Sequence, residues 1–142
     1  MGKNADGSRR IVEEIFGGGN YELAHELIGA DALGHDPAQP QPTRGPDGLI
    51  ANARGYRDAF PDLTLTVNQQ IADGEYVATR WTATGTHKGD LFGIAPTGKQ
   101  STVTGITIDH WVDGKVAEAW VNWDTLGLLQ QIGAMPAAMQ TA

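Results

Sequence analysis

The chain of 142 residues contains no cysteine, which excludes disulfide scaffolds, thiolate metal sites and cysteine nucleophiles. It also has no apolar run that approaches the roughly 18 residues of a membrane-spanning helix. Its polar start, MGKNADGSRR, lacks the apolar core of a signal peptide. We therefore expect a soluble, cytoplasmic protein without a membrane partner.

Basic residues are few and scattered. The sequence has 10 Lys and Arg against 17 Asp and Glu, which gives a net charge of −7. Nucleic acids and anionic membranes are bound by concentrated basic faces, so we expect neither as a partner. The four histidines show no ligand spacing, and no phosphate-binding glycine loop or nucleophile-elbow serine is present. We therefore expect no metal and no cofactor, and a small neutral or weakly charged ligand fits better.

The length predicts one domain that spans residues 1–142. Helical spacing of apolar residues indicates a first helix that Ser8 caps and that runs through Phe16. A second helix is expected at 21–29, and a third at 47–60 after Pro46. A short extended piece at 32–35 separates the second helix from the third.

Long extended stretches follow the helices, at 63–72, 76–87, 101–112 and 116–123. Asp-Gly pairs mark hairpin turns at two of the three joints. Helices followed by a meander of strands predict an α+β fold, with helices packed on one face of a bent antiparallel sheet. Between the second and third helices, residues 36–48 contain four prolines and two glycines and predict an irregular loop. This loop is either a lid on a cavity or a solvated connector.

Four segments in fixed order carry a family resemblance: YRDAFPDL at 56–63, the stretch 77–99, DGKVAEAW at 113–120 and DTLGLLQQIG at 124–133. Together they resemble the SnoaL-like polyketide and ester cyclases of the nuclear-transport-factor-2-like superfamily. The resemblance implies a cone-shaped α+β barrel, in which a curved antiparallel sheet wraps around N-terminal helices and a C-terminal helix follows. It also implies a deep cavity for a hydrophobic, polyketide-like small molecule, and a sheet-to-sheet homodimer in which Trp120 faces outward.

The resemblance also locates a difference in the catalytic groups. Closure of a ring by aldol condensation needs a base that takes a proton from carbon next to a carbonyl group and an acid that protonates the alkoxide formed. In the cyclases that we compare, an aspartate on the last strand serves both roles, assisted by a histidine and a glutamine on the strand before. These positions are Val121, Thr107 and Gly105 here. We therefore expect that this chain does not use the proton relay of the aldol cyclases.

Strand alternation predicts which side chains share the cavity. A three-residue loop at 113–115 would keep odd-numbered residues of both strands on one side. The predicted substrate-binding residues are Phe16, Tyr56, Phe60, Trp81, Thr107, Val121 and Trp123. The aromatic members would offer flat apolar walls, and core packing is the alternative for some of them.

Two residues are candidates for catalysis. Asp109 is predicted on the cavity side of its strand, where it would act as a base or as a hydrogen-bond acceptor. The alternative is a solvated carboxylate near the turn, or one paired with Arg80 or Lys115. His35 suits proton transfer near neutral pH, with Asp36 to orient it, or is a solvated residue before a proline turn. We further predict that Asp124 caps the last helix and that His110 faces away from the cavity.

Three functions stay open. The first is a cofactor-free cyclase or isomerase of secondary metabolism in which shape and desolvation assist the reaction. The second is a non-catalytic protein that binds a hydrophobic small molecule. The third is an epoxide hydrolase, which needs carboxylates beside an arginine, whereas the sequence places Thr82 and Val121 near Arg80.

Overall fold

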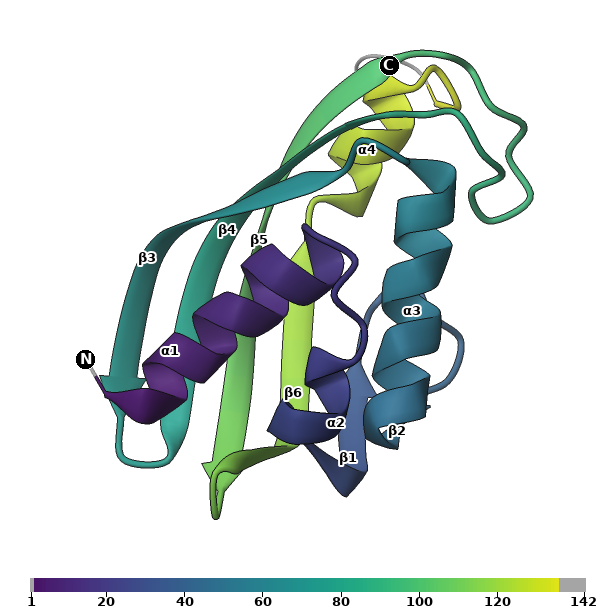
Figure 1. Ribbon diagram of the computed structural model, residues 1–142. Coiled ribbons are helices and arrows are strands. Elements are labelled where there is room, and N and C mark those ends of the chain that lie inside the picture. Colours follow the sequence, from purple (N-terminus) through teal and green to yellow (C-terminus); the bar gives the residue numbers. More distant parts are fainter. Residues whose placement is uncertain (1, 136–142) are drawn as a thin grey trace.

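The computed structural model describes residues 2–135. Its helices lie on the concave side of one curved, six-stranded sheet (Figure 1). The strand order is β2-β1-β6-β5-β4-β3. The bounds are β1 (Ile28–His35), β2 (Thr43–Arg44), β3 (Thr64–Asp73), β4 (Tyr76–Thr86), β5 (Gln100–Val112) and β6 (Lys115–Trp123). The α+β prediction and the four-strand meander are confirmed, but β1 pairs with β6 in parallel, so the sheet is mixed rather than antiparallel.

The N-terminal helix begins earlier than the sequence predicts. Helix α1 (Lys3–Arg10) continues directly into a π-helix, η1 (Ile11–Phe16). Ser8 is therefore no helix cap: it lies within the helix and is fully buried, on the same apolar stripe as Ile11 and Ile15. That stripe places Ser8 against the sheet.

The second helix is shorter than expected and the strand after it is longer. Helix α2 covers Leu23–Leu27, and β1 begins at the next residue. The segment 36–48, predicted to be irregular, contains β2 and the first turn of α3 (Gly45–Ala59). Helix α3 has Pro46 in its first turn and ends before Pro61, as the prolines predict.

The β5–β6 hairpin has the predicted alternation of side chains, but a two-residue turn and a bulge produce it instead of a three-residue loop. Its turn has two residues, Asp113 and Gly114, whose φ angles of 51° and 81° are those of a type I′ turn. A two-residue turn alone would exchange the faces of one strand. A bulge in β6 next to Trp111 adds one residue and restores the odd-numbered face. The resulting register pairs Gly105 with Trp123, Thr107 with Val121 and Asp109 with Ala119.

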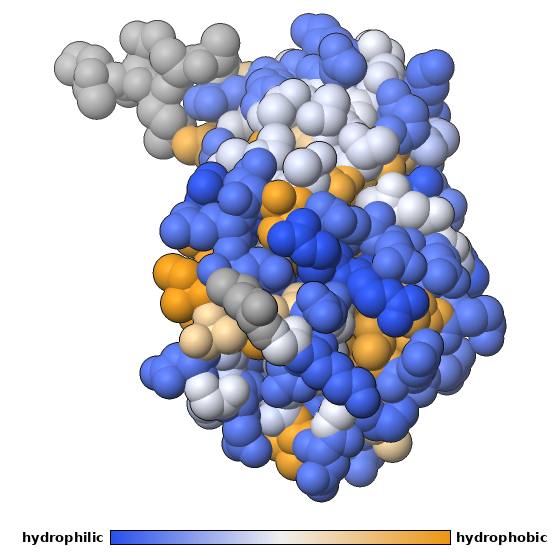
Figure 2. Space-filling model, turned by 60° about the vertical axis from the view of Figure 1, so that its left-hand side comes forward, coloured by the Kyte–Doolittle hydropathy of each residue, from blue (hydrophilic) through white to orange (hydrophobic). Residues whose placement is uncertain are grey.

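The last helix, α4 (Thr125–Gln131), follows β6 and packs against β5. The Asp124 carboxylate accepts a hydrogen bond from the Gly127 backbone N–H at 2.9 Å, which confirms the predicted cap. Among the described helices, none has the length and apolarity to cross a bilayer. On the face shown in Figure 2, hydrophobic residues form small patches separated by hydrophilic ones.

Candidate functional site

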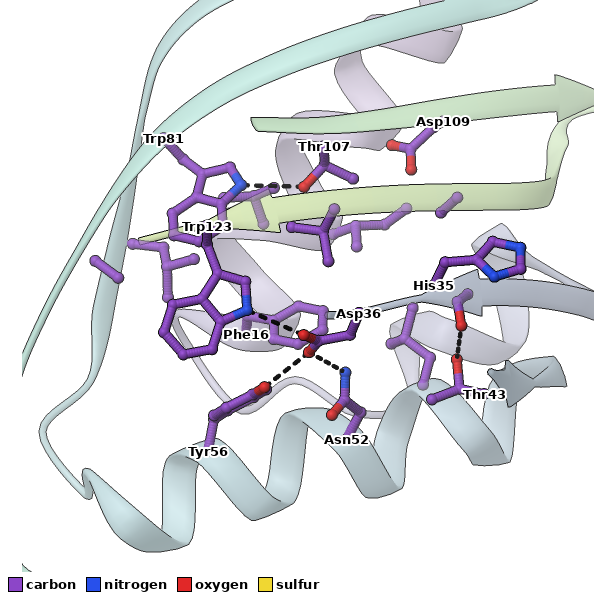
Figure 3. Close-up of a pocket in the computed structure, with 18 of the residues that line it drawn as sticks. Phe16, His35, Asp36, Thr43, Asn52, Tyr56, Trp81, Thr107, Asp109 and Trp123 are labelled. Carbon is purple, nitrogen blue, oxygen red and sulfur yellow. Dashed lines mark hydrogen bonds between the residues drawn. The ribbon is translucent and has the colours of Figure 1, made fainter. Parts of the chain in front are cut away.

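A cavity of about 160 Å³ lies between the helices and the concave face of the sheet, and its walls are mostly apolar (Figure 3). All seven predicted substrate-binding residues line it: Phe16, Tyr56, Phe60, Trp81, Thr107, Val121 and Trp123. Both predicted catalytic residues, His35 and Asp109, are in the lining as well. Asp36, expected only to orient His35, also lines the cavity, and so does Asn52, which the sequence did not single out.

Asp36 is the centre of a polar cluster that includes Tyr56, Asn52 and Trp123 (Figure 3). Its Oδ2 accepts from the Tyr56 hydroxyl at 2.7 Å and more weakly from Asn52 Nδ2 at 3.4 Å. Its Oδ1 accepts from Trp123 Nε1 at 3.0 Å and from the Ala38 backbone N–H at 2.9 Å. Asp36 therefore acts as a carboxylate acceptor that joins β1, α3 and β6 around the cavity.

A signal for this cluster exists in the sequence. Asn52 and Tyr56 are four residues apart on α3 and so share a face of the helix, where both present polar groups to the cavity. Burial and the charge of Asp36 raise the pKa of the Tyr56 hydroxyl, which stays protonated and keeps donating. The Oδ1 atom of Asn52 is buried and has no hydrogen-bond partner among residues 2–135.

The imidazole of His35 points away from this cluster (Figure 3). It stacks on Trp120, with ring centroids 5.9 Å apart, and its Nε2 lies 2.7 Å from Glu118 Oε2. Trp120 and Glu118 are even-numbered residues on the outer face of β6. The ring is thus directed to the outer side of the sheet, and a catalytic role of His35 stays a prediction.

Asp109 lies in the cavity wall on β5 and is only 3% exposed. Its Oδ2 accepts a hydrogen bond from the Ser8 hydroxyl at 2.6 Å, and Ser8 in turn accepts from Trp111 Nε1 at 2.9 Å. Burial raises the pKa of the Asp109 carboxyl to about 6, and the bond from Ser8 offsets part of that effect. The expected alternatives, a wet carboxylate or a pair with Arg80 or Lys115, are not what the structure shows.

Arg80 and Lys115 have other contacts. The Arg80 side chain is exposed and donates to Gln69, and Lys115 Nζ donates to the backbone carbonyls of His25 and Glu26. His110 stacks on Tyr76 and bonds Glu75 on the outer face, as the alternation predicts. Within the described range, no three His, Asp or Glu side chains gather in the manner of a metal site.

Gly105, Thr107 and Val121, the positions that the sequence resemblance compares with the cyclase relay, lie close together on β5 and β6. Gly105 leaves room for the Trp81 indole, because a Cβ at 105 would collide with its ring carbons. The Trp81 Nε1 atom then donates to Thr107 Oγ1 at 3.0 Å. Val121 lies opposite Thr107 on β6. An indole and a valine thus occupy this part of the wall, with the Thr107 hydroxyl already accepting.

A second depression of about 570 Å³ adjoins the cavity. The two share Thr43, Asn52 and Tyr56 in their linings. The Tyr56 ring stands edge-on to Trp123 of the cavity, at 5.7 Å, and to Phe92 of the outer depression, at 6.1 Å. Tyr56 is therefore the partition between an inner apolar space and an outer, more polar one.

The outer depression is bordered by the loop that joins β4 to β5. His87 holds this loop: its backbone pairs with Lys99 and Gly98, and its Nδ1 accepts from the Thr97 backbone N–H. Its ring is fully buried and stacks on Phe60. His87 therefore positions the loop, and it does not line the cavity.

A curved sheet that closes over helices around one internal cavity defines the class of nuclear-transport-factor-2-like α+β proteins. Within this class, residues 8–132 match the family model described as SnoaL-like polyketide cyclase, and the chain belongs to this family.

Named relatives agree with this assignment. The aklanonic acid methyl ester cyclase DauD of Streptomyces sp. (strain C5) is 29% identical over 138 residues, which cover 94% of this chain and 83% of the relative. The cyclase DnrD of Streptomyces peucetius is 28% identical and covers 94% and 92%. The crystal structure of IdmH, a putative polyketide cyclase from Streptomyces antibioticus, has a TM-score of 0.78 at 31% identity over 93% of this chain and 99% of IdmH.

Proposed function

We propose that this protein is a cofactor-free cyclase or isomerase that acts on a hydrophobic, polyketide-type small molecule. The observation that carries the proposal is Asp109, a buried carboxyl in the wall of an apolar cavity whose pKa is raised to about 6. A carboxyl with a pKa near neutrality can both accept and return a proton at cellular pH. This is the requirement for a reaction at carbon next to a carbonyl group.

In this proposal the side chain that transfers the proton is not one of those at the relay positions of the compared cyclases. Val121, Thr107 and Gly105 supply no acid or base, so Asp109 takes that role from another part of the same wall. The Asp36 cluster fixes part of the cavity wall by joining three elements. The aromatic walls then hold the carbon skeleton in a reactive shape and exclude water.

The volumes support a substrate that enters by one end. A dry cavity of about 150 Å³ binds benzene, so the inner space of about 160 Å³ suits one or two rings. The remainder of a larger molecule would occupy the outer depression beyond Tyr56.

Two measurements test the proposal. Native mass spectrometry of the purified protein, followed by solvent extraction, would identify a retained small molecule. Turnover of that molecule, and of the aklanonic acid methyl ester named for the relatives, is then followed by liquid chromatography and mass spectrometry. We expect Asp109→Asn to abolish turnover while affinity is retained, and His35→Ala to have a much smaller effect because its ring contacts Glu118 and Trp120.

The alternative function is that of a non-catalytic binding protein. The replacement of the relay by an indole, a threonine hydroxyl and a valine favours it, because these groups bind apolar molecules and transfer no proton. Retention of one ligand per chain without any conversion would support this alternative. An epoxide hydrolase finds less support, because Arg80 is exposed and bonds Gln69 on the outer face.

We also propose that the protein forms a homodimer through the outer face of its sheet. Apolar side chains follow one register row across four strands, from Ile71 through Ala78 and Ile108 to Trp120. Ile71, Ile108 and Trp120 are 61%, 41% and 38% exposed. A second copy of this face is self-complementary in an isologous dimer and would remove these side chains from water.

A further inference from the structure

Ser8 and Trp111 form a buried hydrogen-bonded chain that ends on the carboxyl group of the proposed reaction. Ser8 is fully buried and Trp111 is 2% exposed. The Ser8 Oγ atom lies 2.9 Å from Trp111 Nε1 and 2.6 Å from Asp109 Oδ2. A role of this chain in catalysis rests on the proposed function, in which Asp109 transfers a proton.

The direction of this chain is fixed by chemistry. An indole N–H can only donate, so the Ser8 oxygen accepts from Trp111. The single hydrogen of the Ser8 hydroxyl is then left for Asp109 Oδ2, which accepts it. Because Oδ2 already accepts this hydrogen bond, the acid proton of Asp109 is carried by the other oxygen.

The other carboxyl oxygen has a different environment. No described residue donates to Oδ1, and it is not among the fully buried atoms without a partner, which are Asn52 Oδ1 and His87 Nε2. Since Asp109 lines the cavity, Oδ1 is the atom accessible from it. The neighbours of Asp109 across the sheet, Val77 and Ala119, carry no ionisable group. The other titratable side chains of the lining are His35, Asp36 and Tyr56.

We propose that Ser8, held in place by Trp111, is a positioning residue that assigns the transferable proton of Asp109 to Oδ1. In the base step a lone pair of Oδ1 takes a proton from carbon next to a carbonyl, the C–H bond breaks, and its electron pair stays on the substrate as an enolate. In the acid step the Oδ1–H bond breaks and the proton passes to an alkoxide oxygen of the substrate, which restores the carboxylate. The proton taken from carbon is the one given to oxygen, so no further reactant is needed. Ser8 donates to Oδ2 in both states.

Local sequence serves this arrangement. A Cβ at Gly7 would collide with the Trp111 ring, so the glycine before Ser8 lets the indole approach the helix. The pair Gly7-Ser8 therefore supplies a close approach and a donor at adjacent positions of α1.

The test follows the titration of Asp109 directly, in the whole protein and without substrate. The Asp109 side-chain carboxyl carbon is observed by ¹³C NMR from about pH 3 to about pH 9, a range that spans ordinary and raised carboxyl pKa values. Ser8→Ala removes the donor to the carboxylate, and we expect the Asp109 midpoint to rise by about one pH unit. Trp111→Phe, which frees the Ser8 hydroxyl to turn, should raise it by less. Ser101→Ala is the matched control: Ser101 is buried on the same face of β5 and should leave the midpoint unchanged.

Unchanged midpoints in both Ser8→Ala and Trp111→Phe would overturn the proposal. If Ser8→Ala does not fold, Ser8→Cys keeps the shape with a weaker donor, and an unchanged midpoint there overturns it equally. With a substrate in hand, Ser8→Ala should lower kcat with little change in KM. The NMR titration needs no turnover and is therefore independent of the activity assays. A protein that only carries its ligand would fail the activity assays, and this failure would be distinguished from a failure of the NMR test.

Discussion

The Trp81 indole occupies the space that a side chain at Gly105 would fill, and its N–H donates to Thr107 Oγ1 at 3.0 Å. The absence of a side chain at 105 is therefore what admits the indole to the cavity wall. Gly105 and Thr107 are thus joined through the Trp81 side chain.

Gly105→Ala should destabilise the protein by about 1–3 kcal/mol, because the new methyl group collides with ring atoms of Trp81 and with Trp123 Cβ. Urea unfolding followed by circular dichroism measures the change. Gly55→Ala is the matched control: position 55 is inside α3, and a Cβ there meets no atom within 4 Å. This substitution should stabilise by up to about 1 kcal/mol through helix propensity. Equal effects of the two substitutions would contradict the packing argument.

The sequence predicts the sheet well because strand alternation and Asp-Gly turns are local signals. The four predicted cavity residues on strands, Trp81, Thr107, Val121 and Trp123, line the cavity for the same reason. The bulge next to Trp111 was not predictable, because it depends on pairing between two strands. The two-residue turn and the bulge together nevertheless keep the odd-numbered side chains of both strands on the cavity side, as the predicted three-residue loop would have done.

The polar part of the site was harder to predict. Ser8 was assigned to a helix start by residue type, although Ala5, Ile11 and Ile15 place it on a buried helical stripe. Asp36 was considered only as a partner of the adjacent His35, whereas its donors come from Tyr56 and Trp123, which are distant in sequence. Side-chain pairs of this separation depend on the assembled fold.

Asp124→Ala should cost about 1 kcal/mol, because the carboxylate accepts from the Gly127 N–H in the first turn of α4. Asp124→Asn retains an acceptor and should cost a few tenths of that. Thermal or urea unfolding of the two variants gives the comparison. Equal losses would show that charge rather than the hydrogen bond is responsible.

Ile108→Asp should dissociate the proposed dimer, because it places a charge in the centre of the apolar row on the outer face. Light scattering coupled to size-exclusion chromatography measures the mass. Thr104→Asp, on the same face of β5 but outside that row, should retain the dimer. A wild-type protein that is monomeric at all concentrations would exclude this interface.

Asp109 should make the protein less stable as the pH rises from about 4 to about 6. Its folded pKa of about 6 lies above the value of about 3.9 in an unfolded chain. The folded state thus holds a proton that the unfolded state releases, so the stabilisation is complete below pH ~4 and is lost as pH rises through ~6. Two pKa units correspond to roughly 3 kcal/mol. The measurement is the free energy of unfolding of wild type and Asp109→Asn across this range.

The difference in stability, wild type minus Asp109→Asn, should decrease through that window, since asparagine does not titrate. Asp62 provides a control of opposite sign. Its carboxylate accepts from the Thr86 backbone N–H at 2.7 Å and from the Thr86 hydroxyl at 2.8 Å, and these bonds lower its pKa. Its stabilisation is present at higher pH and is lost as the pH falls, so the corresponding difference for Asp62→Asn should increase with pH. Parallel curves for wild type and Asp109→Asn would mean that Asp109 ionises normally in the fold, and the acid–base role proposed for it would lose its basis.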